Sequence, residues 1–400
     1  MSRIKNIARP FFHTSRRLLA KLWLQSHGKA TVIGVTGSYG KTNTVAAIEA
    51  VLSQKFKALT TDINLDTTFN IPITILKLTN QEKLILEYGV DRVGEMNRHL
   101  SLAKPKIAVV TGISPVHADK AHLGSLENII KEKAKLVKAV PKDGFAVLNY
   151  EIPEVRRMGD DCKGKVFFYG FDKNRVSVWA NRIKLTATGL EFNLHYKDQM
   201  IKARTSLIGT AFVENCLAAA AVGILSNMDI SLIARGLESL KPMEGRMSIE
   251  QGPKGTVILN DSRRANPASA IAGLQALDEY PAKRKIAVIG EMGELGEWEE
   301  KGHRQVGAEV GLVKPNYLIA VGPVTKYIVT EAEKNMKRGT VIWVNDVFEA
   351  AGVLSSLVKS GDLIYLKGSL LKHLERIPLI MEGKQVDPDE VAFKRYEVYR

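Results

Sequence analysis

The chain has 400 residues, 45% of them hydrophobic and 25% charged, a balance typical of folded globular proteins and not of disordered ones. This length exceeds what a single hydrophobic core usually supports, so we expect at least two domains. No apolar run reaches the roughly 20 residues of a membrane-spanning helix, and the only cysteines, Cys162 and Cys216, form neither a disulfide framework nor a metal-binding spacing, which predicts a protein of the reducing cytoplasm.

The net charge of +14 is concentrated at the N-terminus. Residues 1–30 contribute +7 of it and contain no acidic residue, while Phe, Leu and Trp residues interleave with the basic ones. Three roles remain open for this basic amphipathic arm: a leader helix that packs on the first domain, a helix in peripheral contact with an anionic membrane, and a presequence or nucleic-acid arm. No RNA- or DNA-binding motif supports the last role, so we expect no nucleic-acid partner.

An apolar strand runs into a glycine turn in Thr31-Val-Ile-Gly-Val-Thr-Gly-Ser-Tyr-Gly-Lys-Thr42, which predicts a phosphate-binding loop. Gly37 and Gly40 let main-chain N–H groups approach phosphate oxygens, Lys41 supplies a positive charge, and Thr42 can offer its hydroxyl to magnesium. The loop is shorter than the ordinary P-loop, whose first glycine would stand at Val35. The predicted ligand is ATP, and the predicted binding residues are Thr36, Gly37, Ser38, Tyr39, Gly40, Lys41 and Thr42.

Alternating strands and helices follow the loop. Short apolar runs at 58–62, 84–88, 106–111, 145–149 and 165–169 are typical of buried parallel strands. Period-two alternation between 176 and 207 predicts antiparallel hairpins, and helices are expected at 213–226 and 231–240. After a break at 241–245, apolar runs at 257–260, 285–290, 317–322, 341–344 and 362–366 alternate with helical stretches.

These patterns predict an α/β protein of two domains behind the arm of residues 1–30. A P-loop central ATPase domain (31–241) combines a parallel sheet with antiparallel hairpins, and a smaller Rossmann-like α/β domain (242–400) follows it. We expect the charged residues 384–400 to form a solvated tail or a surface helix.

Several separated motifs resemble the Mur ligases and their folylpolyglutamate synthetase relatives, which use ATP to join an amino acid or peptide to a carboxylate. The loop has the T-G-x-x-G-K-T form of that family. Segments 86–95, 109–133 and 291–307 are similar to its E-L-G-x-x-x-x-G-E, its N-x-x-x-x-H plus G-S-x-x-x-x-x-x-K, and the G-D-M-x-E-L-G…H-x-x-V-G of the members that add D-alanyl-D-alanine. Gly245-Arg246, Asp261-Ser262, Ala265-Asn266-Pro267 and Lys367-Gly-Ser369 follow in the expected order, so the resemblance covers residues 31 to about 380.

The resemblance implies an ADP-forming amide ligase of cell-wall peptide synthesis, which activates a carboxylate as an acyl phosphate for attack by an amine. Lys41, Glu87, His117 and Lys133 are the implied catalytic residues, and Thr42, Glu87, His117 and Lys133, the last as a carbamate, are the implied ligands of two Mg²⁺ ions. The nucleotide would also meet Asn215, Arg246 and Asp261, and Arg263 could clamp a phosphate. The implied contacts to the second substrate are Lys367, Ser369 and Asn266. We expect small-molecule or peptide substrates and a monomer.

The chain also departs from the family pattern. Only about 30 residues precede the loop, where the adding enzymes carry a domain that grips the uridine nucleotide, and Ala211-Phe212 stands in place of His-Asn. Arg263-Arg264 replaces Tyr-Asn, and Leu370 replaces an arginine. Recognition of the acceptor therefore stays open, a lipid-borne acceptor included.

Two other classes of function remain open beside the ligase. One is a non-catalytic nucleotide-binding scaffold, against which the retention of the loop and of the metal positions argues. The other is a P-loop ATPase coupled to motion, which lacks a second nucleotide motif.

Overall fold

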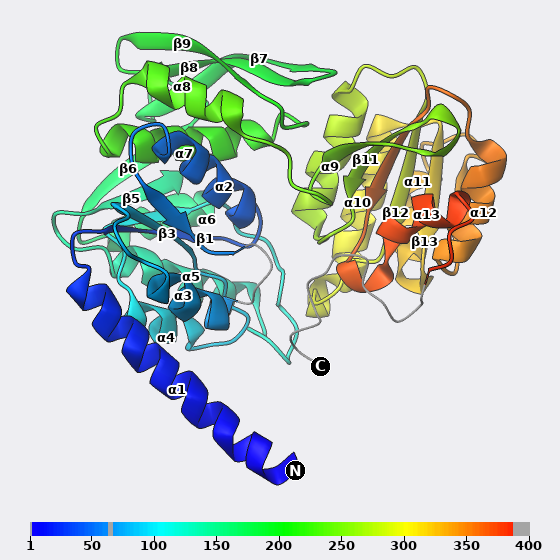
Figure 1. Cartoon of the computed structure of the whole chain (residues 1–400). Coiled ribbons are helices and arrows are strands. Elements are labelled where there is room, and N and C mark those ends of the chain that lie inside the picture. The colour runs from blue at the N-terminus through cyan, green and yellow to red at the C-terminus, as the bar shows by residue number, and fades with distance from the viewer. Residues whose placement is uncertain (1, 63–66, 387–400) are drawn as a thin grey trace.

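The fold is described from a computed structural model, which covers residues 2–62 and 67–386. Its first sheet has nine strands in the order β2-β3-β1-β4-β5-β6-β7-β8-β9 (Figure 1). Pairing is parallel from β2 to β7 and antiparallel in the hairpins β7–β8 and β8–β9, which confirms the predicted combination. The strands are β1 (Thr31–Thr36), β2 (Ala58–Thr60), β3 (Lys83–Glu87), β4 (Ile107–Val110), β5 (Phe145–Asn149), β6 (Lys165–Gly170), β7 (Val178–Thr186), β8 (Gly189–Tyr196) and β9 (Gln199–Thr205).

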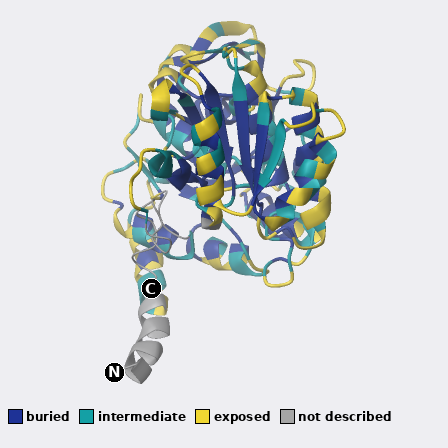
Figure 2. Cartoon of the chain, turned by 90° about the vertical axis from the view of Figure 1, so that its right-hand side faces the viewer, coloured by how far each residue is buried: buried dark blue, intermediate teal, exposed yellow. Residues whose placement is uncertain are grey.

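A second sheet of six strands has the order β10-β11-β15-β12-β13-β14 and is parallel except for β10. Its strands are β10 (Ser248–Gln251), β11 (Val257–Asp261), β12 (Lys285–Gly290), β13 (Tyr317–Val321), β14 (Val341–Val344) and β15 (Leu363–Lys367). Strand β10 was not predicted, because its four residues include a single apolar side chain, Ile249. Buried strands lie between helices whose outer faces are exposed (Figure 2).

The helices of the second sheet follow the alternation of its side chains. Leu259, Ala287 and Tyr365 point to the face covered by α9 (Pro267–Glu279), α10 (Glu299–Val313) and α11 (Lys326–Ala332). Their neighbours Ile258 and Val288 point to the other face, against α12 (Val347–Leu357) and α13 (Ile377–Met381). Both faces of the sheet are therefore covered, as parallel strands require.

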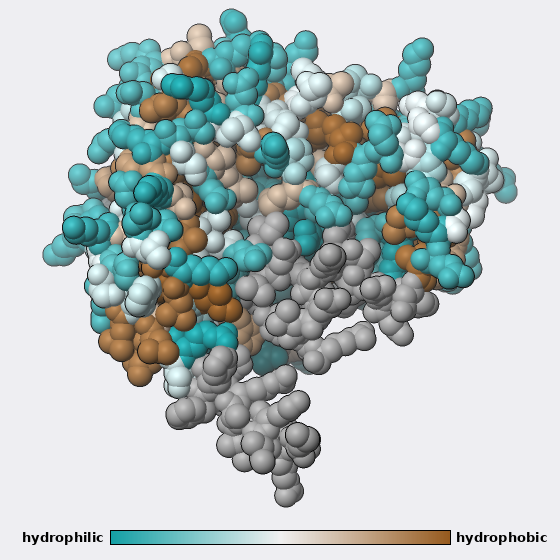
Figure 3. All heavy atoms as spheres, viewed as in Figure 1, coloured by the Kyte–Doolittle hydropathy of each residue, from teal (hydrophilic) through white to brown (hydrophobic). Residues whose placement is uncertain are grey.

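The N-terminal helix α1 (Ser2–Ser26) contacts α3 (Thr67–Leu76) and α4 (Glu95–Leu102). Ala20 is fully buried in this contact, and Trp23 Nε1 donates a hydrogen bond to Leu78 O at 2.7 Å. Hydrophobic surface gathers at the lower left of Figure 3, over the part of α1 nearest the domain. Within the described residues, no helix is long and apolar enough to cross a membrane. Most of the predicted tail, from 387 to 400, lies outside the described residues.

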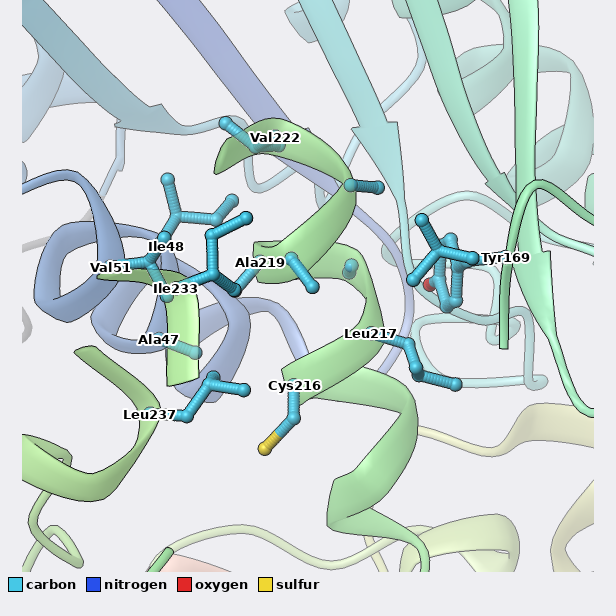
Figure 4. Close-up of a cluster of buried hydrophobic side chains, with 14 of the residues drawn as sticks. Ala47, Ile48, Val51, Tyr169, Cys216, Leu217, Ala219, Val222, Ile233 and Leu237 are labelled. Atoms are coloured by element: carbon cyan, nitrogen blue, oxygen red, sulfur yellow. The ribbon is translucent and has the colours of Figure 1, made fainter. Parts of the chain in front are cut away.

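The core of the first sheet is built on two faces. α2 (Lys41–Leu52), α7 (Phe212–Leu225) and α8 (Ile230–Ser239) cover one face, and Figure 4 shows their apolar side chains converging. α3, α4 and α5 (Leu126–Lys138) cover the other, and the short α6 (Pro153–Arg157) lies beside β5. From Cys216 onward, helix α7 is apolar on all sides because it is buried, with Ala218 through Ala221 fully inaccessible. At Gly236 a Cβ atom would come within 2.5 Å of Val51 Cα, so α8 can approach α2 only with glycine there.

Candidate active site

The phosphate loop follows β1 and leads directly into α2. Gly37 (φ 152°) and Gly40 (φ 77°) have backbone angles that favour glycine, and a Cβ atom on Gly37 would lie 2.0 Å from Thr111 Oγ1. Lys41 Nζ donates a hydrogen bond to Gly37 O at 2.8 Å, and Thr42 is 7% exposed. The start of α2 thus presents backbone N–H groups, a lysine and a hydroxyl together, a combination that suits a phosphate.

A single pocket collects most of the predicted site residues. Its lining includes the loop from Gly37 to Thr42 and residues that end strands of both sheets. Ligands of parallel sheets bind at the carboxyl ends of the strands, so the position agrees with that rule. The predicted residues that line it are Gly37, Ser38, Tyr39, Gly40, Lys41, Thr42, Glu87, His117, Lys133, Asn215, Arg246, Asp261, Asn266 and Lys367.

Two lysines and two carboxylates meet beside the loop. Lys133 is 2% exposed, and burial together with the nearby charge of Lys41 lowers its pKa to about 7. Burial also lowers the pKa of Lys41, while Glu87 and Asp91 oppose both shifts. The carboxylates of Glu87 and Asp91 therefore offset part of the cost of burying these two amines.

Local structure explains why Lys133 faces the pocket. The side chain of Ser125 accepts a hydrogen bond from Asn128 N at 3.1 Å and so caps the helix that carries Lys133. In the middle of the helix, the buried carboxylate of Glu132 accepts from Gly94 N and Met96 N, which fixes α5 against α4. In the G-S…K motif, Ser125 therefore marks the start of α5, and Lys133 lies about two turns further along the same helix.

His117 lies where the two halves of the molecule meet. Its Nε2 is 3.3 Å from Asp91 Oδ1 and its Nδ1 is 3.0 Å from Glu294 Oε2, so carboxylates from both sheets hold the ring. The close contact with His117 lowers the pKa of Glu294. The backbone of His117 has φ 63°, and Leu123 N donates to its carbonyl at 2.9 Å. His122 lies beside this pair: one ligand atom each from His117, His122 and Glu294 lie within 4.8 Å of one another, an arrangement that can hold a divalent cation.

The motif at 291–307 holds the loop that places Glu294 beside His117. His303 is fully buried; its Nε2 accepts from Met292 N at 3.1 Å, and its Nδ1 lies 2.7 Å from Glu299 O. Glu291 accepts from Val324 N at 2.8 Å and pairs with Lys372. These contacts anchor both ends of the loop within the second sheet, and its middle reaches the first.

Four predicted residues of the second half line the pocket. Lys367 Nζ lies 2.6 Å from Asp261 Oδ2, so these two buried groups pair with each other. Burial lowers the pKa of Lys367 and raises that of Asp261, and the ion pair opposes both shifts. Asn266 caps α9 by accepting from Ser269 N at 2.9 Å. Arg246, on the connection that precedes β10, completes this group.

Three predicted residues do not line the pocket. Thr36 is fully buried and donates from Oγ1 to Tyr88 O at 2.8 Å. Arg263 is 5% exposed, and its guanidinium donates to Glu244 O, so it braces the connection between the sheets. Ser369 donates from its backbone to Glu291 O at 2.9 Å. The pocket is lined by Arg264 in place of Arg263, because β11 ends at Asp261 and its alternation does not continue into the turn.

Asn215 has a structural contact that the resemblance did not indicate. Its Nδ2 donates to Thr44 Oγ1 at 2.7 Å and to Gly40 O at 3.2 Å, which ties α7 to the loop. Its amide oxygen is the atom that can accept a hydrogen bond from a ligand.

Sequence reasoning missed several pocket residues. Asp91 stands four residues after Glu87 in the quoted motif, a spacing that could have identified it. Arg264 stands beside a quoted motif, and Glu294, which contacts His117 without lining the pocket, stands within one, but nothing in the sequence shows that they approach the other sheet. No sequence pattern pointed to Tyr169 or Glu214 as pocket residues, because tyrosine in a strand and glutamate in a helix are common.

The buried carboxyl group of Glu214 should make the free energy of unfolding depend on pH. Burial raises its pKa to about 7, although Asn149 Nδ2 donates to it at 2.7 Å. The folded protein therefore binds a proton there between about pH 4.5 and 7 that the unfolded chain releases, so the free energy of unfolding falls as pH rises through this window. Because glutamine mimics the protonated carboxyl, Glu214→Gln should reduce this fall by on the order of 2 kcal/mol.

Urea unfolding at pH 5 and at pH 7.5 measures the effect. Glu238→Gln, at an exposed position of α8, is the matched control and should leave the difference between the two pH values unchanged. Equal differences for wild type and Glu214→Gln would show that Glu214 is not protonated in the folded protein.

Comparisons with known proteins agree with this geometry. The Mur ligase middle domain matches residues 35–223, and the Mur ligase glutamate ligase domain matches residues 245–370. The UDP-N-acetylmuramoyl-tripeptide–D-alanyl-D-alanine ligase of Escherichia coli is 30% identical over 302 residues, which are 75% of this chain and 66% of that protein. The ligase of the same name from Mycobacterium tuberculosis is 30% identical over 86% of this chain and 71% of its own length. The MurF ligase of Thermotoga maritima, solved with ADP, superimposes with a TM-score of 0.81 at 24% identity, over 93% of this chain and 84% of that one.

Fold and site together define a nucleotide-binding α/β enzyme whose phosphate loop faces a second sheet across one pocket. The chain belongs to the Mur ligase family, a family of ATP-dependent ligases. The predicted fold class and family are confirmed. The chain spans about two thirds of the length of the Escherichia coli relative.

Proposed function

We propose that the chain is an ADP-forming peptide ligase that joins the amine of an amino acid or dipeptide to the carboxylate of a cell-wall precursor. The observation that carries the proposal is the meeting of Lys41, Glu87, His117 and Lys133 in one pocket with Arg246 and Arg264 from the second half of the chain. A scaffold needs no such convergence of buried ionisable groups, so we place the non-catalytic alternative second.

The proposed reaction has two steps. A carboxylate oxygen of the acceptor attacks the γ-phosphorus of ATP, the bond to the β-phosphate oxygen breaks, and ADP leaves. The amine then attacks the carbonyl carbon of the acyl phosphate, loses a proton, and expels inorganic phosphate as the amide forms. Lys41 and the N–H groups of the loop would hold the phosphates, and the arginines would offset the negative charge that develops on them.

The residues of the pocket fit magnesium. Thr42, Glu87 and Asp91 offer the hard oxygen ligands that this ion prefers, and His117 is held in place by two carboxylates. When bound, Mg²⁺ neutralises phosphate charge. We propose two such sites, with carbamylated Lys133 as a ligand: a buried amine of pKa about 7 is largely neutral at pH 7.5, and only the neutral form reacts with CO₂ to give a carbamate and a proton.

The relatives' names suggest D-alanyl-D-alanine as the amine substrate and a muramoyl peptide as the acceptor. The pairing of Lys367 with Asp261, and Leu370 in place of an arginine, mean that the contacts to this substrate remain a prediction. We further propose a cytoplasmic monomer in which residues 31–241 and 242–400 act as two domains that close over ATP.

Product analysis tests the proposal. The purified chain, ATP and Mg²⁺ are incubated with UDP-N-acetylmuramoyl-tripeptide or other cell-wall precursors and with D-alanyl-D-alanine or single D-amino acids. We expect ADP release that requires both substrates and a product whose mass equals their sum less one water. ATP binding without turnover against the whole panel would favour the scaffold.

A further inference from the structure

Three leucines of α1 face away from the protein. Leu18, Leu19 and Leu22 are 59%, 58% and 54% exposed, and Trp23 beside them is 40% exposed. At about 100° per residue, the three leucines fall within roughly 100° of the helix circumference and form one apolar stripe. Trp23 lies at the edge of this stripe, where its Nε1 donates to Leu78 O. Figure 3 shows this hydrophobic surface at the lower left. We name Leu18, Leu19 and Leu22 the α1 stripe.

The α1 stripe is not the seam that attaches the helix to the domain. The fully buried Ala20 lies about 150° around the helix from the centre of the stripe. Ala20 and the partly buried Leu24 pack into the core beneath α3 and α4. An amphipathic helix normally buries its apolar face against its own domain, so the orientation of α1 calls for another apolar environment.

Positive charge surrounds the α1 stripe. Lys21 and Lys29 are exposed, and residues 1–30 contain seven Lys and Arg residues without one Asp or Glu. Arg17 donates a hydrogen bond to the main-chain oxygen of Arg98 on α4, which brings a further exposed base beside the helix. Half of the net charge of the chain thus lies on less than a tenth of its length.

We propose that the α1 stripe docks on the surface of an anionic lipid bilayer. Leucine side chains would enter the boundary between headgroups and acyl chains, and the flanking lysines would lie at the level of the lipid phosphates. A protein partner would also cover apolar side chains, but the absence of any acidic residue from the arm favours a surface that is uniformly negative. Docking uses none of the pocket residues, so it stands whether or not the ligase proposal does.

Vesicle co-sedimentation of the full chain tests the docking. Leu18→Gln/Leu22→Gln removes apolar side chains but keeps helix propensity. Leu312→Gln/Phe348→Gln is the matched control, because these side chains are 73% and 49% exposed on helices of the second half. The vesicles are phosphatidylcholine alone and phosphatidylcholine mixed with phosphatidylglycerol.

Wild type and control should sediment with the anionic vesicles, less with phosphatidylcholine alone, and less as salt rises. The partition of Leu18→Gln/Leu22→Gln should be lower by on the order of tenfold or more. Equal partition of this variant and wild type, or no binding of wild type, overturns the proposal. A dimer of wild type that the variant converts to monomer would assign the α1 stripe to self-association and overturn it too. ATP turnover with soluble substrates should be the same in all three proteins, and its absence from all three would contradict only the ligase.

Discussion

Replacing Lys41 with alanine should lower the turnover of ATP by on the order of a thousandfold. Lys41 is the one residue of the loop that can bring a full positive charge to the phosphates, and its Nζ already lies in the loop, 2.8 Å from Gly37 O. Burial lowers the pKa of this lysine, so its charge does not stabilise the folded protein at neutral pH. The melting temperature should therefore not fall.

The comparison uses substrate-dependent ADP release and thermal unfolding of the same preparations. The matched control is Lys57→Ala, because Lys57 is exposed on the connection between α2 and β2. This variant should keep full activity. If Lys41→Ala turned over ATP at the wild-type rate while folded, the loop would not be the phosphate site.

Replacing Lys133 with alanine should lower kcat by at least on the order of a hundredfold, because a metal ligand would be lost. With the ordinary pKa of 10.5, only about one lysine in a thousand would be neutral at pH 7.5, whereas the lowered value of about 7 makes the neutral amine abundant. Activity of wild type should therefore rise with pH through about 7 when CO₂ is supplied, and this rise should be absent from the alanine variant.

Two further measurements separate a carbamate from a plain lysine. Acetate or formate should partly restore activity to Lys133→Ala by supplying the missing carboxylate, and ¹³CO₂ should give a carbamate resonance in wild type that the variant lacks. Lys131→Ala is the control, because this lysine is exposed on the same helix and pairs with Glu127. Unchanged activity of Lys133→Ala, or an identical ¹³C spectrum for both proteins, would exclude the carbamate.

The sequence predicted the strands of the first sheet closely, and helices α7 and α8 within one residue. Buried parallel strands are short continuous apolar runs, and β1, β3, β4, β5 and β6 each coincide with one within two residues. The hairpins β7–β9 were identified because period two is visible in their partly exposed side chains. The phosphate loop could be located because glycine, lysine and threonine act there through local backbone geometry.

The pocket required more than local pattern. No sequence pattern indicates that Glu294 reaches His117 from the other sheet, or that Lys367 forms an ion pair with Asp261. Arg264 in place of Arg263 depends on one turn after β11, where strand alternation no longer applies. The outward orientation of Leu18 and Leu22 could not be derived either, because a helical pattern does not say which face meets the domain.

The sequence by itself therefore determined the family, the order of all strands but β10, and the position of the loop that is predicted to meet phosphate. Each of these depends on neighbours within a few residues or on motifs in fixed order. Only the tertiary structure decided which ionisable groups share the pocket and which face of α1 is exposed. These properties depend on burial and on distances between residues far apart in the chain, and burial is what lowers the pKa of Lys133 and raises that of Glu214.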